Sequence, residues 1–113
     1  MIIRMPRGDI RLVRFVIHNP DETVTDIDFT EIYFTVKKTG RVRDYKFQKR
    51  LTTGGIEKIG PGDYEVRIEP ADTNAMEFGN YRFDIQLMFE DELKETFVGD
   101  FVLTEEITSE ENE

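Results

Sequence analysis

The sequence predicts an all-β fold in which about seven short strands form two sheets packed face to face. Three observations lead to this fold class. Apolar and polar residues alternate in several short segments, and residues that favour turns separate these segments. No stretch of ten or more residues has apolar residues at a helical period. Closure of the same strands into a small barrel is the alternative.

Five strands are predicted before residue 70. Residues 10–17 carry apolar side chains on both faces, which is typical of a strand covered on two sides. Residues 31–38 instead alternate between an apolar and a polar face. Residues 44–49, 56–59 and 64–68 follow with short apolar or alternating patterns. Turns rich in glycine, proline and asparagine separate these segments, so we expect each strand to fold back on a neighbour.

The chain after Pro70 begins with a short helical pattern and ends with two strands. Residues 71–76 predict a single helical turn, in which Asp72 and Thr73 act as caps. Residues 81–90 alternate most regularly, and Glu90-Asp91-Glu92 is predicted to be the tip of a hairpin. The returning strand is predicted over residues 96–104.

A tyrosine motif precedes the strongest strand. Residues 77–83 read Glu-Phe-Gly-Asn-Tyr-Arg-Phe, which resembles the tyrosine corner of immunoglobulin-type sandwiches. The resemblance implies that the Tyr81 hydroxyl bonds to the backbone a few residues upstream. Gly79 is expected to have a positive φ, and Phe83 stands where the second core cysteine of those sandwiches would be. Asp72, Thr73, Gly79, Tyr81 and Phe83 therefore form a predicted structural corner of an immunoglobulin-like antiparallel β-sandwich. With no tryptophan and no cysteine, the chain has no antibody-type core.

Composition and charge limit the domain organisation and the partners. The 113 residues suit one domain over residues 1–104, followed by an acidic tail over residues 105–113 that we expect to be disordered. A formal net charge of -9 disfavours nucleic acid and anionic membranes as partners. The N-terminal sequence lacks the apolar core of a signal peptide, and no apolar run reaches the ~18 residues of a membrane span.

Charge is also unevenly distributed along the chain. The first basic zone consists of Arg4, Arg7, Arg11 and Arg14, and the second of Arg41, Arg43, Lys46, Lys49 and Arg50. The acidic end consists of Glu105, Glu106, Glu110, Glu111 and Glu113. These zones are either solvated surfaces or the source of head-to-tail contacts between copies.

No catalytic, cofactor-binding or metal-binding site is predicted. His18 is the single histidine and there is no cysteine, so neither a catalytic triad nor a zinc site is indicated. Asp84, Glu65 and Glu90 fall on the polar faces of strands, and Ser109 stands alone in the acidic tail. We therefore expect no enzymatic activity.

Two binding alternatives follow from side chains on polar faces and loops. Residues 90–92 and the pair Asp26 and Asp28 offer carboxylates for calcium, but neither has the spacing of an EF-hand, and a solvated hairpin tip is the favoured interpretation. Tyr33 and Tyr45 offer rings for a carbohydrate platform, but tyrosines on a strand face more often form cross-strand pairs.

Several short motifs are spread along the chain and together span most of residues 7–108. They are Arg7-Gly8-Asp9, Ile27-Asp28-Phe29-Thr30, Phe34-x-Val36-Lys37-Lys38, Pro70-x-Asp72-Thr73, Gly79-x-Tyr81-x-Phe83-Asp84-Ile85, Thr96-x-x-Gly99-x-Phe101-x-Leu103 and Ile107-Thr108. In this order the chain resembles small domains of phages and prophages of Gram-positive bacteria, related to the N-terminal domain of phage baseplate upper proteins.

The resemblance implies a non-enzymatic structural or assembly module of a virion, associated with the tail or baseplate. Its partners would be other virion or tail proteins or further copies of itself as a homo-oligomer, with no cofactor, nucleic acid or membrane. The protein would be synthesised in the bacterial cytoplasm without a signal peptide and would then be incorporated into the virion. A carbohydrate-binding or cell-surface-binding β-sandwich is the second hypothesis.

Overall fold

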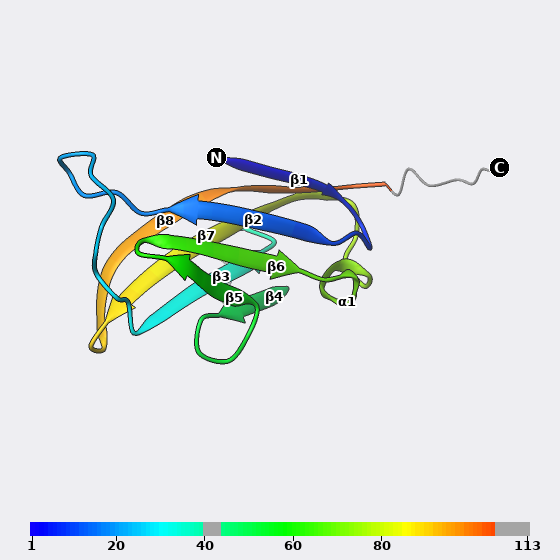
Figure 1. Ribbon diagram of the computed structural model, residues 1–113. Coiled ribbons are helices and arrows are strands. Elements are labelled where there is room, and N and C mark those ends of the chain that lie inside the picture. The colour runs from blue at the N-terminus through cyan, green and yellow to red at the C-terminus, as the bar shows by residue number, and fades with distance from the viewer. Residues whose placement is uncertain (40–43, 106–113) are drawn as a thin grey trace.

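A computed structural model describes residues 1–39 and 44–105 as two β-sheets that pack face to face (Figure 1). The first sheet has five strands in the order β1-β8-β7-β3-β4, and the second has three in the order β2-β6-β5. The elements are β1 (Ile2–Pro6), β2 (Arg11–Val16), β3 (Glu31–Lys37), β4 (Phe47–Arg50), β5 (Ile56–Gly60), β6 (Asp63–Ile68), α1 (Pro70–Thr73), β7 (Gly79–Phe89) and β8 (Glu92–Thr104). The predicted all-β sandwich is confirmed, and the barrel alternative is wrong because the two sheets share no strand.

The strand order is that of an immunoglobulin-like sandwich. Strands β2, β6 and β5 take the places of B, E and D, while β8, β7 and β3 take those of G, F and C. Strand β4 adds to the sheet beside β3, and β1 pairs with β8 in parallel. The other strand pairs are antiparallel, as the sequence predicts.

The core lies between the two sheets and follows the predicted alternation in β3, β6 and β7. The prediction that residues 10–17 are covered on both faces is wrong, because β2 packs on the core with one face only and Leu12 and Val16 on its other face are exposed. Along β7 every second side chain faces the other sheet and is buried; these residues are Tyr81, Phe83, Ile85 and Leu87. The rings of Phe34 and Phe83 stack with centroids 5.4 Å apart, and Phe47 meets Phe101 edge on at 6.0 Å. Aromatic contacts of this kind add to the stabilisation from apolar burial.

One strand was missed in the prediction, and the strand boundaries differ from it most clearly in β8 and β4. Strand β1 was not expected, because its five residues are too few to show a period, yet Ile3 and Met5 are buried. Strand β8 begins at Glu92 because Glu90 and Asp91 both have positive φ and form a tight two-residue turn. Strand β4 begins only at Phe47, so Tyr45 precedes the strand and is exposed.

Part of the charge pattern lies outside the described residues. The predicted disordered tail falls there from residue 106 onward, as do Arg41 and Arg43 of the second basic zone. Within residues 1–39 and 44–105, no helix is long and apolar enough to cross a membrane.

Candidate functional site

The predicted tyrosine corner is present at the start of β7. The Tyr81 hydroxyl donates a hydrogen bond to the Glu77 carbonyl oxygen at 2.6 Å. Gly79 has a φ of 136°, as expected, and the Tyr81 side chain is 3% exposed. Burial raises the pKa of Tyr81 above its ordinary value, so the phenol remains a hydrogen-bond donor at neutral pH. Phe83 points into the core from the same strand, as the motif predicts.

Asp72 caps the helical turn and also joins it to the five-stranded sheet. Its Oδ2 accepts a hydrogen bond from the Glu69 backbone N–H at 2.7 Å, at the N-terminus of α1. The same oxygen lies 2.6 Å from Lys49 Nζ on β4. The predicted capping role of Asp72 is therefore confirmed, and the ion pair to β4 is an addition that sequence spacing does not show.

Thr73 does not act as a cap, and that part of the prediction is wrong. Its side chain is fully buried, and its Oγ1 accepts a hydrogen bond from the Gly8 backbone N–H at 2.9 Å. Gly8 lies in the turn between β1 and β2, so Thr73 connects α1 to a segment 65 residues away. The polar residues of the predicted corner thus hold backbone segments together.

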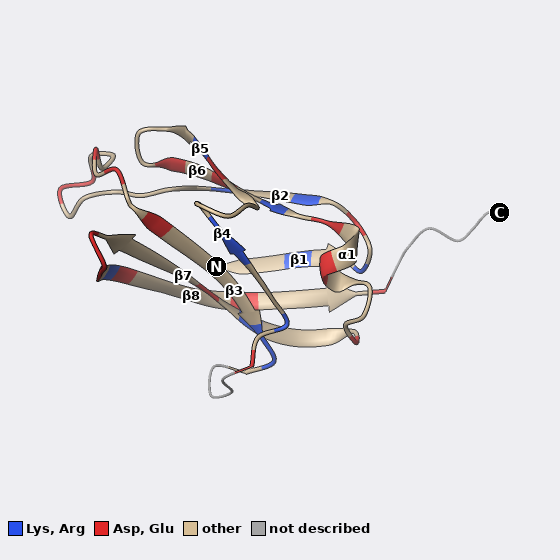
Figure 2. Cartoon of the chain, turned by 90° about the horizontal axis from the view of Figure 1, so that it is seen from below, with Lys and Arg blue, Asp and Glu red and all other residues tan. Residues whose placement is uncertain are grey.

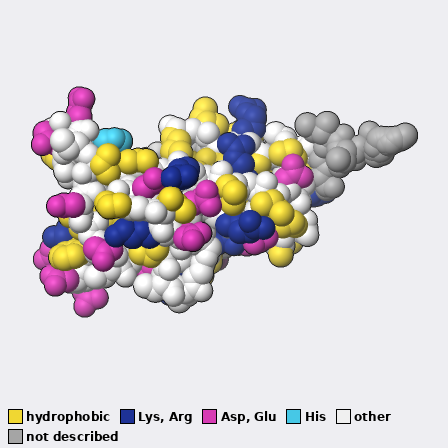
Figure 3. Space-filling view, in the orientation of Figure 1, with side chains coloured by type: hydrophobic (Ala, Val, Ile, Leu, Met, Phe, Trp, Pro, Cys, Tyr) yellow, Lys and Arg dark blue, Asp and Glu magenta, His cyan; other side chains and the backbone are white. Residues whose placement is uncertain are grey.

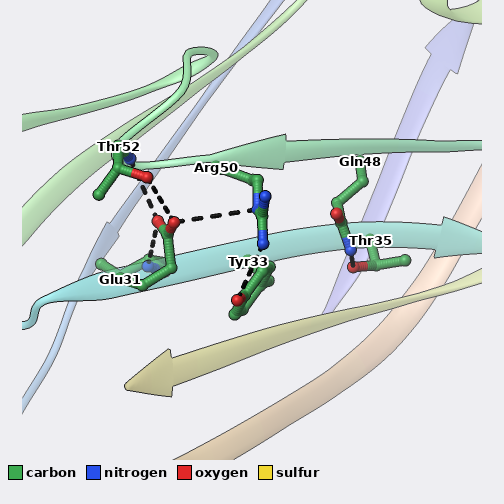
Figure 4. Close-up of polar contacts among 7 residues, drawn as sticks. Glu31, Tyr33, Thr35, Gln48, Arg50 and Thr52 are labelled. Carbon is green, nitrogen blue, oxygen red and sulfur yellow. Dashed lines mark hydrogen bonds and ion pairs between the residues drawn. The ribbon is translucent and has the colours of Figure 1, made fainter. Parts of the chain in front are cut away.

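A second set of polar side chains lies on the outer face of β3 and β4 (Figure 4). The Glu31 carboxylate accepts hydrogen bonds from the Thr52 hydroxyl and from the backbone N–H groups of Thr52 and Ile32. Burial opposes the ionisation of Glu31, but these hydrogen bonds outweigh it and lower its pKa. Arg50 Nη2 donates to the Tyr33 hydroxyl at 3.0 Å. These groups bind one another across the two strands.

The same contacts weigh against a carbohydrate platform made by Tyr33 and Tyr45. The Arg50 guanidinium covers one face of the Tyr33 ring, 4.7 Å from its centroid. Tyr33 lies opposite Arg50 at one end of the β3–β4 pairing, whereas Tyr45 precedes the other end. Because this pairing extends over about 10 Å, the two rings do not form one stacking surface.

Asp84 is less solvated than its polar-face position predicts. It lies on the outer face of β7 opposite Val98, but it is only partly exposed. Burial raises the pKa of its carboxyl group, and the nearby Lys37 only partly opposes this shift. The small depression beside it, ≈ 130 Å³, is lined by Lys37, Arg82, Phe83 and Val98 and holds no second carboxylate. The lining therefore does not offer a pair of acids for hydrolysis.

The carboxylates weighed as calcium ligands are partly engaged by lysines. Asp28 Oδ1 lies 2.8 Å from Lys58 Nζ, and Glu92 Oε1 lies 2.8 Å from Lys94 Nζ. In the described part of the chain, no three histidine, aspartate or glutamate residues are grouped closely enough to hold a metal ion. The geometry gives the calcium hypothesis no support.

An accessible apolar surface lies on an open side of the sandwich between β2 and β8. We call the residues Glu92–Val98 the open edge, because β1 pairs only with Asp100–Thr104 of β8. Beside this edge lies a groove of ≈ 360 Å³, lined by Met1, Phe15, Val16, Ile17, Phe83, Ile85, Phe97 and Val98. Sequence reasoning missed this groove, because its walls come from four separate segments of the chain.

The end of the molecule next to this groove is acidic. Acidic side chains gather where the β7–β8 hairpin and the loop after β2 lie (Figure 3). Figure 2 shows the same clustering at the hairpin tip, with one basic residue beside it. The open side thus joins an apolar groove to a negatively charged end, and this combination is typical of a surface that binds another chain.

Comparisons with known proteins yield one structural likeness. No family model and no curated protein sequence matches the chain. The chain is similar in structure to part of the endo-beta-1,4-mannanase from Thermotoga petrophila, with a TM-score of 0.59 and 13% identity. The match covers 92% of this chain but 18% of the mannanase. At this identity the likeness shows the fold alone.

Proposed function

We propose that this chain is a non-enzymatic structural or assembly module of a phage virion, associated with the tail or baseplate. It joins neighbouring proteins through the open side of its sandwich. The observation that carries the assembly role is the open edge of β8 beside an apolar groove. The virion setting rests on the motif resemblance, from Arg7-Gly8-Asp9 to Thr96-x-x-Gly99-x-Phe101-x-Leu103.

Exposed apolar side chains support the assembly role. Five large hydrophobic residues around the groove and the start of β1 are substantially exposed, and they are Met1, Ile2, Val16, Phe97 and Val98. An exposed cluster of this kind usually marks an interface, because leaving it in water forgoes ~25 cal/mol per Å² of burial. An unpaired strand edge also offers backbone groups to a neighbouring chain.

The non-enzymatic part of the proposal is supported by how the polar groups are used. Glu31 contacts both Arg50 and Thr52, and Asp72 is held by Lys49 and the Glu69 backbone. These side chains therefore contact other groups of the protein, which supports a structural role for them. The carbohydrate hypothesis has less support, because Arg50 covers the Tyr33 ring.

The test is to purify phage particles from the source organism by density gradient and to identify their proteins by mass spectrometry. A virion module should be present in a constant ratio to the tail proteins, and tail, holin or lysin genes should flank its gene. Absence from the particles, together with unrelated neighbouring genes, would overturn the proposal. A carbohydrate-binding module would instead bind polysaccharide as a monomer and lose that binding in Tyr33→Ala or Tyr45→Ala.

A further inference from the structure

We propose that the groove binds an extended segment of a partner protein, which adds to β8 as a strand in line with β1. The segment carries an apolar residue at the inward position beside Phe97 and a basic residue two positions earlier, at the end next to the β7–β8 hairpin. This inference rests on the proposed function as an assembly module, and it specifies the site and the chemistry of the partner.

The backbone of the open edge is arranged for strand addition. The Asp100 N–H donates to the Met1 carbonyl oxygen at 3.1 Å, so the backbone groups of this residue face β1. Successive residues of a strand alternate in direction, and the backbone groups of Val98 and Thr96 therefore face the same edge. The first residue of β1 pairs with Asp100, and in the described part of the chain Val98 and Thr96 pair with β7 alone, so their backbone groups on the other side face no strand.

Strand β1 shows what kind of segment fits this edge. Ile3 and Met5 point inward from β1 and are buried beside Phe101 and Leu103. In the same register, the next inward position before Met1 lies beside Phe97. The groove at that position is lined by Phe15 and Ile85, and the Phe15 ring stacks on buried Tyr64 at 5.7 Å. An apolar side chain of the partner would fill this space.

The far end of the site favours a basic residue. A second hollow of ≈ 220 Å³ shares Ile17 with the groove and is lined in part by His18, Lys94 and Glu95. The next inward position of an added strand lies beside Glu95, which is exposed. The cation on this stretch, Lys94, already bonds to Glu92 at 2.8 Å.

Charge also argues for a partner protein over a second copy of this chain. The formal net charge of the chain is -9, and the acidic residues Glu90, Asp91, Glu92 and Glu95 lie at or beside the open edge, so a second copy would bring further negative charge to this surface. Like charges across an interface disfavour association, whereas a basic segment would be attracted to this end. The chemistry of the site therefore favours an extended segment that is apolar and basic.

The experiment is a nuclear magnetic resonance titration of the whole protein with three capped peptides. The first peptide, Thr-Arg-Thr-Ile-Thr-Ser, has the proposed pattern. The second replaces arginine by glutamate. The third, Thr-Arg-Ile-Thr-Thr-Ser, has the same composition, but its isoleucine is shifted by one position and points to the opposite face of the strand from arginine. We expect saturable shifts of the Thr96 and Val98 amides with the first peptide and about tenfold weaker binding of the other two.

Two variants of the protein localise the binding. Phe97→Lys places a cation in the groove and should abolish binding of the first peptide. Ile59→Lys is the matched control, because Ile59 is 43% exposed on β5 and Phe97 is 39% exposed on β8. The control should bind as the natural chain does, and circular dichroism should show that both variants are folded.

Several outcomes would overturn the inference. These are no saturable binding of the first peptide, equal affinity for all three peptides, or full affinity in a folded Phe97→Lys variant. Self-association of the natural chain that is lost in Phe97→Lys would assign the groove to a second copy instead. Presence in particles without peptide binding would refute only this inference, whereas peptide binding without presence in particles would refute only the virion setting.

Discussion

Strand β8 has two halves that share one backbone and differ in what lies beside them. In the half that pairs with both β1 and β7, Phe101 is 0% exposed. In the open edge, which pairs with β7 alone, Phe97 faces the same inner side and remains 39% exposed. The presence of one neighbouring strand thus decides whether an aromatic residue contributes to the core or to a surface for binding.

Gly99 lies at the boundary between the two halves. A Cβ atom at this position would lie 2.6 Å from the Met1 carbonyl oxygen and 2.6 Å from the Phe83 ring. Because Gly99 has no side chain, Met1, which directly precedes β1, can approach β8 closely, and the Phe83 ring can pack against β8. The comparison teaches that the covered half carries stability, while the open edge is available for function.

The largest expected effect is in the covered half. Phe101→Ala should lower the free energy of unfolding by ~3–5 kcal/mol, because it leaves a cavity in the core. Phe97→Ala, the same change on the same face of the open edge, should cost less than about 1 kcal/mol. Denaturation in urea measures both variants, and equal losses would contradict the comparison.

A smaller effect is expected at the corner that anchors β7. Tyr81→Phe removes the hydroxyl that binds the Glu77 carbonyl oxygen, and it should lower the free energy of unfolding by ~1–3 kcal/mol. Tyr45→Phe is the control, because Tyr45 is exposed and the change should leave the free energy of unfolding unaltered. If the two variants unfold alike, the corner does not stabilise the sandwich.

Asp84 lies on the outer face of β7 beside Val98 of the open edge, and the pH dependence of stability tests how well solvated this face is. Because the folded-state pKa of Asp84 is raised, the folded state binds its proton more tightly than the unfolded state does. The resulting stability is present below the ordinary pKa of 3.8 and is lost as the pH rises through the folded pKa. Asp84→Asn should therefore raise the thermal midpoint at pH 7 relative to the natural chain.

The control for this prediction is the same comparison of thermal midpoints at low pH. At pH 3 the natural carboxyl group is largely protonated, so Asp84→Asn should bring little gain there. Asp26→Asn, a change of an exposed carboxylate in the loop after β2, should shift the midpoint little at pH 7. A lower midpoint for Asp84→Asn at pH 7 would mean that its charge stabilises the fold.

The smallest effect on stability is expected for Val98, which is 60% exposed on the outer face of the open edge. Val98→Lys should change the free energy of unfolding by less than ~0.5 kcal/mol. It should also reduce strand addition, because lysine on an edge disfavours pairing. A large loss of stability in calorimetry would show that this half of β8 is already covered by the chain itself.

Local features of the sequence were sufficient to predict much of the fold. The alternation in residues 81–90 identified β7 and its buried face, because the period of a strand is written in neighbouring residues. The corner was predictable for the same reason, since Tyr81 and Glu77 are four positions apart. The role of Thr73 was not, because its partner Gly8 is 65 positions away.

The sequence by itself determined the all-β class, the buried faces of regularly alternating strands such as β7, and the tyrosine corner, because each depends on residues close together in the chain. Only the tertiary structure decided that β1 pairs with half of β8, that Lys49 meets Asp72, and that a groove opens beside Phe97. These features arise from contacts between distant segments, whose positions depend on how the two sheets pack. The candidate site for function lies among them.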